Sequence, residues 1–243
     1  MNAKTTTKRN IAPQNSTSQK IKTEKLKINP KSLLLSTIYK ALFKKFGPQG
    51  WWPGDTPLEI AIGAILTQQT TWKNVEKAIA SLKKAKALSA KAIWDLPDKE
   101  VEALIRSAGY FRQKTKKLKI FCQHLLRYYD GKIEALVEKP LEEARKELLH
   151  LWGIGDETAD SILCYAGNRK TFVIDAYTKR IFSRLKILTT DSYEKLKRFC
   201  EEKLPQDLYV YQEFHALLVA LGKDFCKPRP KCDKCPLSKA CRA

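Results

Sequence analysis

The segment 149–185 constrains the fold more than any other part of the chain. An apolar helical pattern runs into Gly153-Ile154-Gly155, and a second helical pattern follows directly. Two glycines between helices allow a tight hairpin whose backbone N–H groups can approach an anion closely. An ordinary corner between two packed helices is the alternative interpretation of a bare G-x-G. The segment goes on to a lone acid, Asp175, which stands between an apolar run and another helical pattern.

The charge of the chain indicates a nucleic-acid partner. The 243 residues carry a formal net charge of +20, while 43% are hydrophobic and 9% aromatic, which is enough for a folded core. A basic chain that folds favours nucleic acid first and an anionic membrane surface second. A basic surface that is simply solvated is the alternative. No apolar run approaches the roughly 18–20 residues that a membrane span needs, so we expect no membrane protein.

Residues 1–30 differ in composition from the rest of the chain. They are rich in Lys, Thr, Ser, Asn and Gln, and their single acid is Glu24. Such a segment cannot bury enough apolar surface to fold, so we expect a disordered basic tail that adds non-specific affinity for phosphate. An organellar presequence is the alternative, which is less well supported because the tail is rich in Lys rather than Arg.

Helical periodicity dominates after the tail and predicts an all-α fold. Thr56, Pro57 and Glu59 form a strong helix start, with a capping Thr, a Pro in the first turn and a Glu three residues after the cap. The helix over 58–68 is apolar nearly all round and should be central. Only 171–174 has an extended pattern, which is too short for a sheet. Further helices are expected at about 32–46, 73–87, 98–107, 112–129, 141–152, 156–167, 176–186, 191–203 and 208–222.

Four cysteines crowd the end of the chain with a spacing typical of a metal site. Cys226, Cys232, Cys235 and Cys241 are separated by five, two and five residues. The sequence has no signal-peptide pattern, so we expect a reducing compartment in which thiols bind metal rather than form disulfides. Four thiolates can hold an iron–sulphur cluster or zinc. The remaining cysteines stand alone in helical patterns, where we expect buried core positions: Cys122, Cys164 and Cys200.

The chain after its basic tail resembles the endonuclease III group of helix-hairpin-helix DNA glycosylases. The resemblance is carried by G-I-G-D-E-T-A from Gly153, V-I-D-A-Y-T-K-R from Val173 and the terminal cysteines. It implies a two-lobed, all-α fold with a C-terminal four-cysteine cluster loop. One lobe would be a helical barrel over 56–170 that contains the hairpin, and the other would join 31–55 to 171–243. The implied protein is a monomer that acts on damaged double-stranded DNA in the cytoplasm, associated with the nucleoid.

In that family the acid that matches Asp175 supports cleavage of the N-glycosidic bond. A carboxylate there can stabilise positive charge on the deoxyribose and orient or deprotonate the attacking water. Asp175 also suits the N-cap of the next helix, and it could do both. Relatives that nick the strand carry a Lys where this chain has Glu157, and a carboxylate cannot form a Schiff base. The resemblance therefore implies a monofunctional glycosylase that uses water.

Further motifs are similar to those of the endonuclease III-like 3-methyladenine DNA glycosylases. They imply that Trp51, Trp52 and Trp72 line a pocket, because an alkylated purine is positively charged and stacks well on electron-rich rings. Gln69 takes the place of a Gln that fills the gap left by a flipped base. Buried core positions are the alternative for the tryptophans, and a helix C-terminal cap for Gln69. The motifs are W-W-P, L-T-Q-x-T, S-A-G-Y-F-x-Q-K and G-I-G-x-E-[ST]-A-D-x-I-L-C-Y-A.

The resemblance also assigns the cofactor and the contacts with DNA phosphates. The four terminal cysteines would hold a [4Fe-4S] cluster, although their first gap has five residues where the family usually has six; zinc is the alternative. Two acids, Asp156 and Glu157, follow the hairpin and should weaken its grip on phosphate. The expected phosphate contacts are the hairpin and the basic residues of the first cysteine gap: Gly153, Ile154, Gly155, Lys227, Arg229 and Lys231.

The function implied is excision of alkylated purines in base excision repair, 3-methyladenine first and 7-methylguanine second, without strand cleavage. One competitor is a glycosylase for uracil, thymine or hypoxanthine, in which Glu157 or Gln68 would bind the neutral base. A competitor of another class is a non-catalytic DNA-binding protein, which the retained Asp175 disfavours. No chemistry is assigned to the scattered histidines: His124, His150 and His215.

Overall fold

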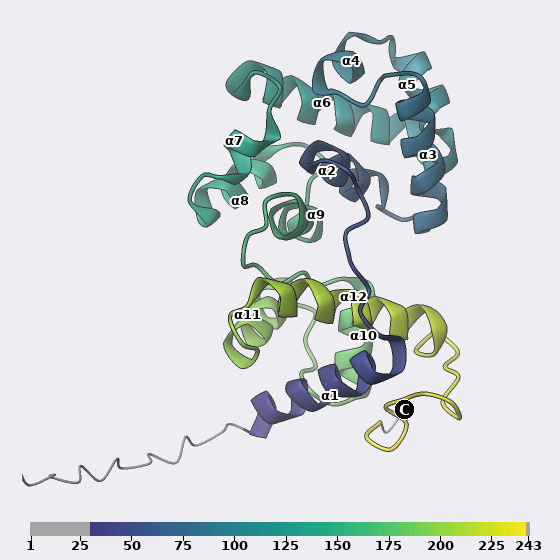
Figure 1. The fold of residues 1–243 in the computed structure, drawn as a ribbon, viewed down its shortest axis with the longest axis vertical. Helices are drawn as coiled ribbons and strands as arrows, with labels where there is room; N and C mark the ends of the chain where they lie inside the picture. Colours follow the sequence, from purple (N-terminus) through teal and green to yellow (C-terminus); the bar gives the residue numbers. More distant parts are fainter. Residues whose placement is uncertain (1–29, 242–243) are drawn as a thin grey trace, which may run out of the picture.

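The computed structural model describes residues 30–241, so the expected basic tail lies outside the described residues except at its last position. Within that range every regular element is a helix and no strand forms, which confirms the predicted all-α class (Figure 1). None of the helices in this range combines the length and the apolar character needed to cross a membrane.

The first hydrophobic core surrounds α2 (Pro57–Leu66), the helix that the sequence predicts to be central. The Thr56 hydroxyl accepts a hydrogen bond from the Glu59 N–H at 3.2 Å, as the start signal predicts. Residues 61–66 of α2 are buried, and the helix contacts two later helices and the π-helical turn that follows α9. These elements are α3 (Trp72–Lys84), α6 (Phe111–Tyr129) and η2 (Ile162–Ala166).

Several short elements complete this core, and two of them are absent from the prediction. They are α4 (Ala90–Asp95) and α7 (Ile133–Val137), which are too short for a 3.6-residue period to show in the sequence. Both bury apolar side chains against the core, among them Ile93 of α4 and Leu136 of α7. The remaining elements match or subdivide predicted helices: α5 (Asp98–Leu104), the 3₁₀ turn η1 (Arg106–Ala108), α8 (Leu141–His150) and α9 (Asp156–Ser161).

A second hydrophobic core joins the beginning and the end of the described chain. It packs α1 (Pro30–Phe46) against α10 (Ala176–Arg184), α11 (Tyr193–Lys203) and α12 (Leu208–Asp224). These helices gather in the lower half of Figure 1, below the helices of the first core. We propose that the two cores correspond to the two expected lobes, 56–170 and 31–55 with 171–243.

A buried ionic cluster connects the two groups of helices. The Asp160 carboxylate on α9 is fully buried and accepts from Arg145 Nε on α8 at 3.0 Å and from Lys197 Nζ on α11 at 2.9 Å. The Thr171 hydroxyl donates to the same carboxylate at 3.0 Å. Because Thr171 begins the extended segment that leads to Asp175, the cluster fixes the path of that segment.

Candidate active site

Asp175 lies where the extended segment 171–174 meets α10, and it caps that helix. Its Oδ1 accepts the Thr178 N–H at 2.7 Å, so the N-cap predicted from the sequence is present. The residue is 7% exposed, with the fully buried Phe172 and Ile174 just before it. Its second oxygen, Oδ2, lies 3.8 Å from Nε2 of His215 on α12. The carboxylate is therefore held at one oxygen and faces an imidazole with the other.

Glu157, on the first turn of α9, is a second acid of the site, and the charge of Asp175 acts on it. Solvent reaches its side chain, but protein atoms crowd around it. This partial desolvation, together with the negative charge of Asp175, raises the pKa of Glu157 to about 7. The site thus contains two carboxyl groups, and no lysine stands at the position of Glu157 to act as a nucleophile.

The three predicted pocket tryptophans come together as one aromatic cluster. Trp52 is central: its ring centroid lies 5.8 Å from that of Trp51 and 5.4 Å from that of Trp72. Gly63 on α2 makes room for two of these indoles, because a Cβ there would lie 3.3 Å from Trp52 Nε1 and 3.6 Å from the Trp72 ring. All three indoles are half-buried, and Trp72 also lines an open cavity of about 310 Å³ beside Pro53.

Two further residues belong to this cluster and were not predicted as site residues. Tyr165 packs on Trp52 with a centroid separation of 5.2 Å, and the His215 ring lies edge-on to Trp51 at 5.8 Å. His215 therefore connects the aromatic cluster to Asp175. Tyr165 stands in the quoted G-I-G motif, which was a usable signal, whereas nothing local distinguishes His215 within the apolar run of α12.

Gln69 lies in the turn after α2, exposed and in the left-handed backbone region with φ of 54°. Its neighbour Gln68 turns inward and donates from Nε2 to the Gly153 carbonyl and to the Thr158 hydroxyl, each at 3.0 Å. Behind this turn the buried ammonium of Lys114 donates to the carbonyl of Leu66 at 2.9 Å. The side chain of Gln68 thus holds the turn against the hairpin, while the side chain of Gln69 is exposed to solvent.

The predicted hairpin lies between α8 and α9. Gly153 has a φ of 89°, a conformation that favours glycine, and the Ile154 side chain is 5% exposed. Gly155 is the N-cap of α9, so the first N–H groups of that helix have no partner within it. Asp156 pairs with Arg145 at 2.8 Å, which offsets one of the two acids that oppose phosphate binding.

The four terminal cysteines line one small cavity after α12. This cavity has a volume of about 90 Å³ and contains all four sulphur-bearing residues in its wall, together with Arg184. Burial, and then the neighbouring thiols, raise the pKa of the Cys235 thiol. No group of three or more candidate ligands in residues 30–241 stands close enough to hold a metal ion in the present loop conformation. Four free thiols that line one cavity are nevertheless a donor set that suits a thiolate-bound metal centre.

Helix α10, which Asp175 caps, also holds the cysteine loop. Arg184 donates to Cys226 Sγ at 3.2 Å and to the Lys227 carbonyl at 2.7 Å. Of the predicted phosphate contacts in this loop, Lys227 is half-buried, and Arg229 and Lys231 are exposed. Arg229 and Lys231 are therefore more accessible than Lys227.

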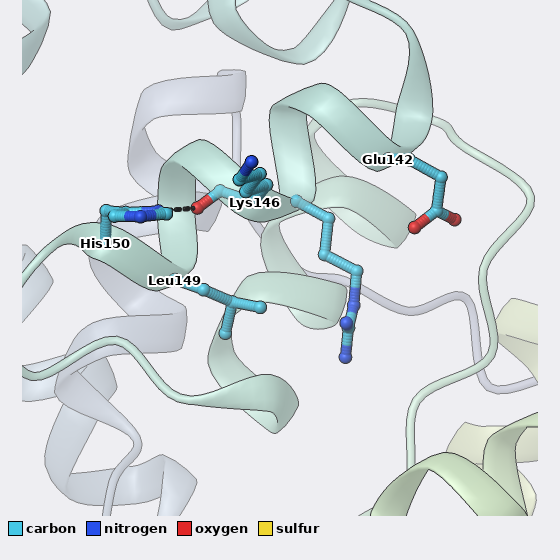
Figure 2. Close-up of a pocket in the computed structure, with 5 residues that line it drawn as sticks. Glu142, Lys146, Leu149 and His150 are labelled. Carbon is cyan, nitrogen blue, oxygen red and sulfur yellow. Dashed lines mark hydrogen bonds between the residues drawn. The ribbon is translucent and has the colours of Figure 1, made fainter.

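A separate pocket of about 330 Å³ lies on α8 and shares no lining residue with the predicted active site. Figure 2 shows its lining residues Glu142, Lys146, Leu149 and His150, with the His150 ring donating to the Lys146 carbonyl at 2.6 Å. The imidazole of His124 lies 2.6 Å from the Glu147 carboxylate, so it too is used locally.

Known proteins resemble this chain along most of its length. A protein of Methanocaldococcus jannaschii, named provisionally as a DNA repair glycosylase, is 43% identical over 210 residues, which cover 86% of this chain and 96% of that protein. The Helicobacter pylori 3-methyladenine DNA glycosylase bound to 1,N6-ethenoadenine matches with a TM-score of 0.69 and 26% identity, over 79% of this chain and 97% of that one.

An endonuclease III solved in a non-covalent complex with DNA matches with a TM-score of 0.75 and 25% identity, over 87% of this chain and 95% of that one. The family model described as "HhH-GPD superfamily base excision DNA repair protein" matches residues 62–206. This range includes the aromatic Trp72, the hairpin and Asp175. The chain belongs to the HhH-GPD superfamily of base excision DNA repair proteins: it is a DNA glycosylase, and its partner is DNA.

Proposed function

We propose that this glycosylase hydrolyses the N-glycosidic bond of alkylated purines, with 3-methyladenine as the first substrate and 7-methylguanine as the second, and leaves the strand intact. The observation that carries the proposal is the aromatic cluster of Trp51, Trp52 and Trp72, connected through His215 to Asp175. A cationic purine gains more from electron-rich rings than a neutral base does. The name of the H. pylori relative supports the same substrate class.

Asp175 is the proposed catalytic acid. An N-alkylated purine already carries positive charge, which makes it a good leaving group. The enzyme therefore mainly has to stabilise the positive charge that develops on the sugar. An ionised Asp175 stabilises the oxocarbenium-like deoxyribose and orients or deprotonates the water that attacks its anomeric carbon. The bond between that carbon and the purine nitrogen breaks as the bond to the water oxygen forms. Glu157 offers no amine for an imine, so the product is an abasic site.

Gln69 is the proposed wedge that enters the duplex where the base leaves. Its exposed side chain on a left-handed turn is held out from α2, while Gln68 and Lys114 fix the turn behind it. Flipping costs a few kcal/mol of stacking and pairing, and a hydrogen-bonding filler offsets part of this cost. The hairpin residues Gly153 to Gly155, with Arg229 and Lys231, are the proposed phosphate contacts.

The proposed cofactor is a [4Fe-4S] cluster held by Cys226, Cys232, Cys235 and Cys241, with zinc as the alternative. When bound, it would fix the loop that carries Arg229 and Lys231 and would have no part in the hydrolysis. The iron, sulphide and zinc content of the purified protein separates the two assignments. In the variant Cys235→Ser we expect loss of the metal and weaker DNA binding, since the loop would lose its anchor.

One assay tests the function. Purified protein is incubated with duplexes that carry 3-methyladenine, 7-methylguanine, uracil, mismatched thymine or hypoxanthine, and the products are treated with alkali. We expect base release from the first two duplexes and strand breaks only after alkali. Breaks before alkali would rule out the monofunctional assignment, release of uracil or thymine alone would favour mismatch repair, and no release from any duplex would favour a DNA-binding protein without catalysis. Asp175→Asn should bind DNA and release no base.

A further inference from the structure

His215 occupies a closed position between the aromatic cluster and Asp175. The residue is 4% exposed and sits on the long apolar helix α12. Its Nδ1 lies 2.6 Å from the Tyr165 hydroxyl, and its Nε2 lies 3.8 Å from Asp175 Oδ2. Within the described residues, Nε2 is buried and has no hydrogen-bond partner. A buried ring nitrogen without a hydrogen-bond partner is uncommon and needs an explanation. One explanation is that Nε2 forms its hydrogen bond when substrate is bound.

The Tyr165 hydroxyl determines which ring nitrogen carries the proton. This hydroxyl has one hydrogen and two neighbours, Nδ1 of His215 at 2.6 Å and the Gln212 carbonyl at 3.2 Å. If the phenol donates to the nearer Nδ1, the neutral imidazole carries its hydrogen on Nε2, which faces the carboxylate. The opposite tautomer would place the Nε2 lone pair against the negative charge of Asp175. Both the shorter distance and the charge favour hydrogen on Nε2.

We propose that His215 is a positioning residue for base excision, which donates from Nε2–H to Asp175 Oδ2, and that Tyr165 selects the tautomer that makes this possible. The inference rests on the proposed role of Asp175 in the hydrolysis. The present 3.8 Å separation is longer than a hydrogen bond, and such contacts often tighten when substrate binds. A shortening of about 0.8 Å would bring the two atoms to a normal hydrogen-bond distance.

The consequence for the reaction is orientation of the carboxylate. The Thr178 N–H holds Oδ1 of Asp175 at 2.7 Å, so a second donor at Oδ2 would fix the plane of the group. Burial lowers the pKa of His215 while the charge of Asp175 raises it, and the net direction is downward, in keeping with a neutral donor. The ring of His215 also lies edge-on to Trp51, so the same imidazole borders both the aromatic cluster and Asp175.

The histidine tautomer can be read directly in the wild-type protein. The chain has three histidines, so ¹⁵N-labelled imidazole resonances can be assigned by replacing His124 and His150 in turn. At neutral pH we expect His215 as the neutral form with hydrogen on Nε2. In Tyr165→Phe, which keeps the ring but loses the hydroxyl, we expect a mixture of tautomers. A wild-type His215 with hydrogen on Nδ1, or a charged imidazolium, would overturn the inference.

Single-turnover kinetics test the effect on the reaction. In His215→Leu, loss of a buried hydrogen bond to a charged group should lower the rate of base release roughly 10- to 100-fold. The dissociation constant for an undamaged duplex should stay within about threefold of wild type, because the proposed phosphate contacts lie in the hairpin and the cysteine loop. His215→Gln places an amide N–H near the position of Nε2 and should recover most of the lost rate. His150→Gln, on the surface of α8, is the matched control.

The outcomes separate this inference from the proposed function. No base release by the wild type would remove the proposed function, and full activity of Asp175→Asn would remove Asp175 from the mechanism, whatever His215 does. If the wild type is active and Asp175→Asn is not, a His215→Leu rate equal to wild type would overturn the positioning role. A His215→Gln rate as low as that of His215→Leu would also overturn it, since packing alone would then explain the loss. Thermal unfolding of each variant identifies any that fail to fold, and Tyr165→Phe then provides the kinetic test.

Discussion

The Gln68 side-chain amide donates to the carbonyl oxygen of Gly153 at 3.0 Å, across 85 positions of sequence. The same nitrogen donates to the Thr158 hydroxyl, and Lys117 donates to the Gln68 side-chain oxygen. One glutamine therefore joins the turn that carries Gln69 to the hairpin that is proposed to bind phosphate. A shift of the hairpin on the DNA backbone would be transmitted to the wedge through this contact.

Replacing Gln68 by Glu keeps the size of the side chain and removes both donors. A carboxylate would face the Gly153 carbonyl without a hydrogen to share, and its attraction to Lys117 should offset only part of this cost, so the free energy of unfolding should fall by about 1–3 kcal/mol. Urea denaturation measures this value. Gln69→Glu is the matched control, because this neighbouring side chain is exposed and its replacement should change stability by less than about 0.5 kcal/mol. Equal stability of the two variants would contradict the structural role of Gln68.

The two hairpin glycines should respond differently to alanine. Gly153 has a φ of 89°, and a Cβ there would lie 2.5 Å from Lys117 Cγ, so Gly153→Ala should destabilise the fold by about 1–2 kcal/mol. Gly155 has a φ of −101° and open space around a Cβ. The free energy of unfolding of Gly155→Ala should therefore lie within about 1 kcal/mol of the wild-type value.

Gly155 should matter for DNA binding although it matters little for stability. Its added methyl group would project where a phosphate approaches the start of α9, so Gly155→Ala should bind a duplex more weakly even though it folds normally. Fluorescence anisotropy with a labelled duplex at fixed salt measures the dissociation constant. Unchanged affinity in Gly155→Ala would remove the hairpin from the set of phosphate contacts.

Local signals account for the parts of the fold and site that could be predicted. The start of α2 depends on Thr56, Pro57 and Glu59, which lie within four residues of one another, and the Asp175 cap is equally local. Helices α4 and α7 were missed because elements of 6 and 5 residues do not span two helical turns.

The contacts that complete the site are not local. Tyr165 meets His215 across 50 residues, and the meeting depends on how α12 packs against η2. A histidine in an apolar helix has the same sequence pattern whether it faces a core or a carboxylate. The inward turn of Gln68 is likewise decided by a partner on a distant hairpin, so no local pattern in the sequence predicts its structural contacts.

The buried carboxylate of Asp160 should contribute strongly to the free energy of unfolding. Its carboxylate is 0% exposed and balances Arg145 and Lys197, so Asp160→Ala would leave two largely buried cations without their shared partner. We expect a loss of about 3–5 kcal/mol in the free energy of unfolding, measured by urea denaturation. Glu194→Gln removes an acid that contacts the same Arg145 but is 56% exposed, and should cost less than about 1 kcal/mol. Similar losses in both variants would contradict this assignment.

Glu157 should make DNA binding depend on pH near neutrality. Because burial and the charge of Asp175 raise its pKa to about 7, the group is mostly neutral at pH 6 and mostly ionised at pH 8. The ionised form repels phosphate, so bound DNA should favour the proton and raise this pKa further. Affinity should therefore fall as pH rises from 6 to 8, with a slope of at most about tenfold per pH unit for one proton.

Anisotropy titrations of the Asp175→Asn protein at pH 6, 7 and 8 would avoid turnover but would also remove a charge that acts on Glu157. An uncleavable duplex with the wild-type protein is therefore the better choice, at constant ionic strength because salt changes phosphate binding independently. Glu157→Gln cannot ionise, so its affinity should vary less across this range and exceed that of the wild type most clearly at pH 8. Parallel pH curves for the two proteins would mean that another group is responsible and that the Glu157 carboxylate lies outside the electrostatic reach of bound DNA.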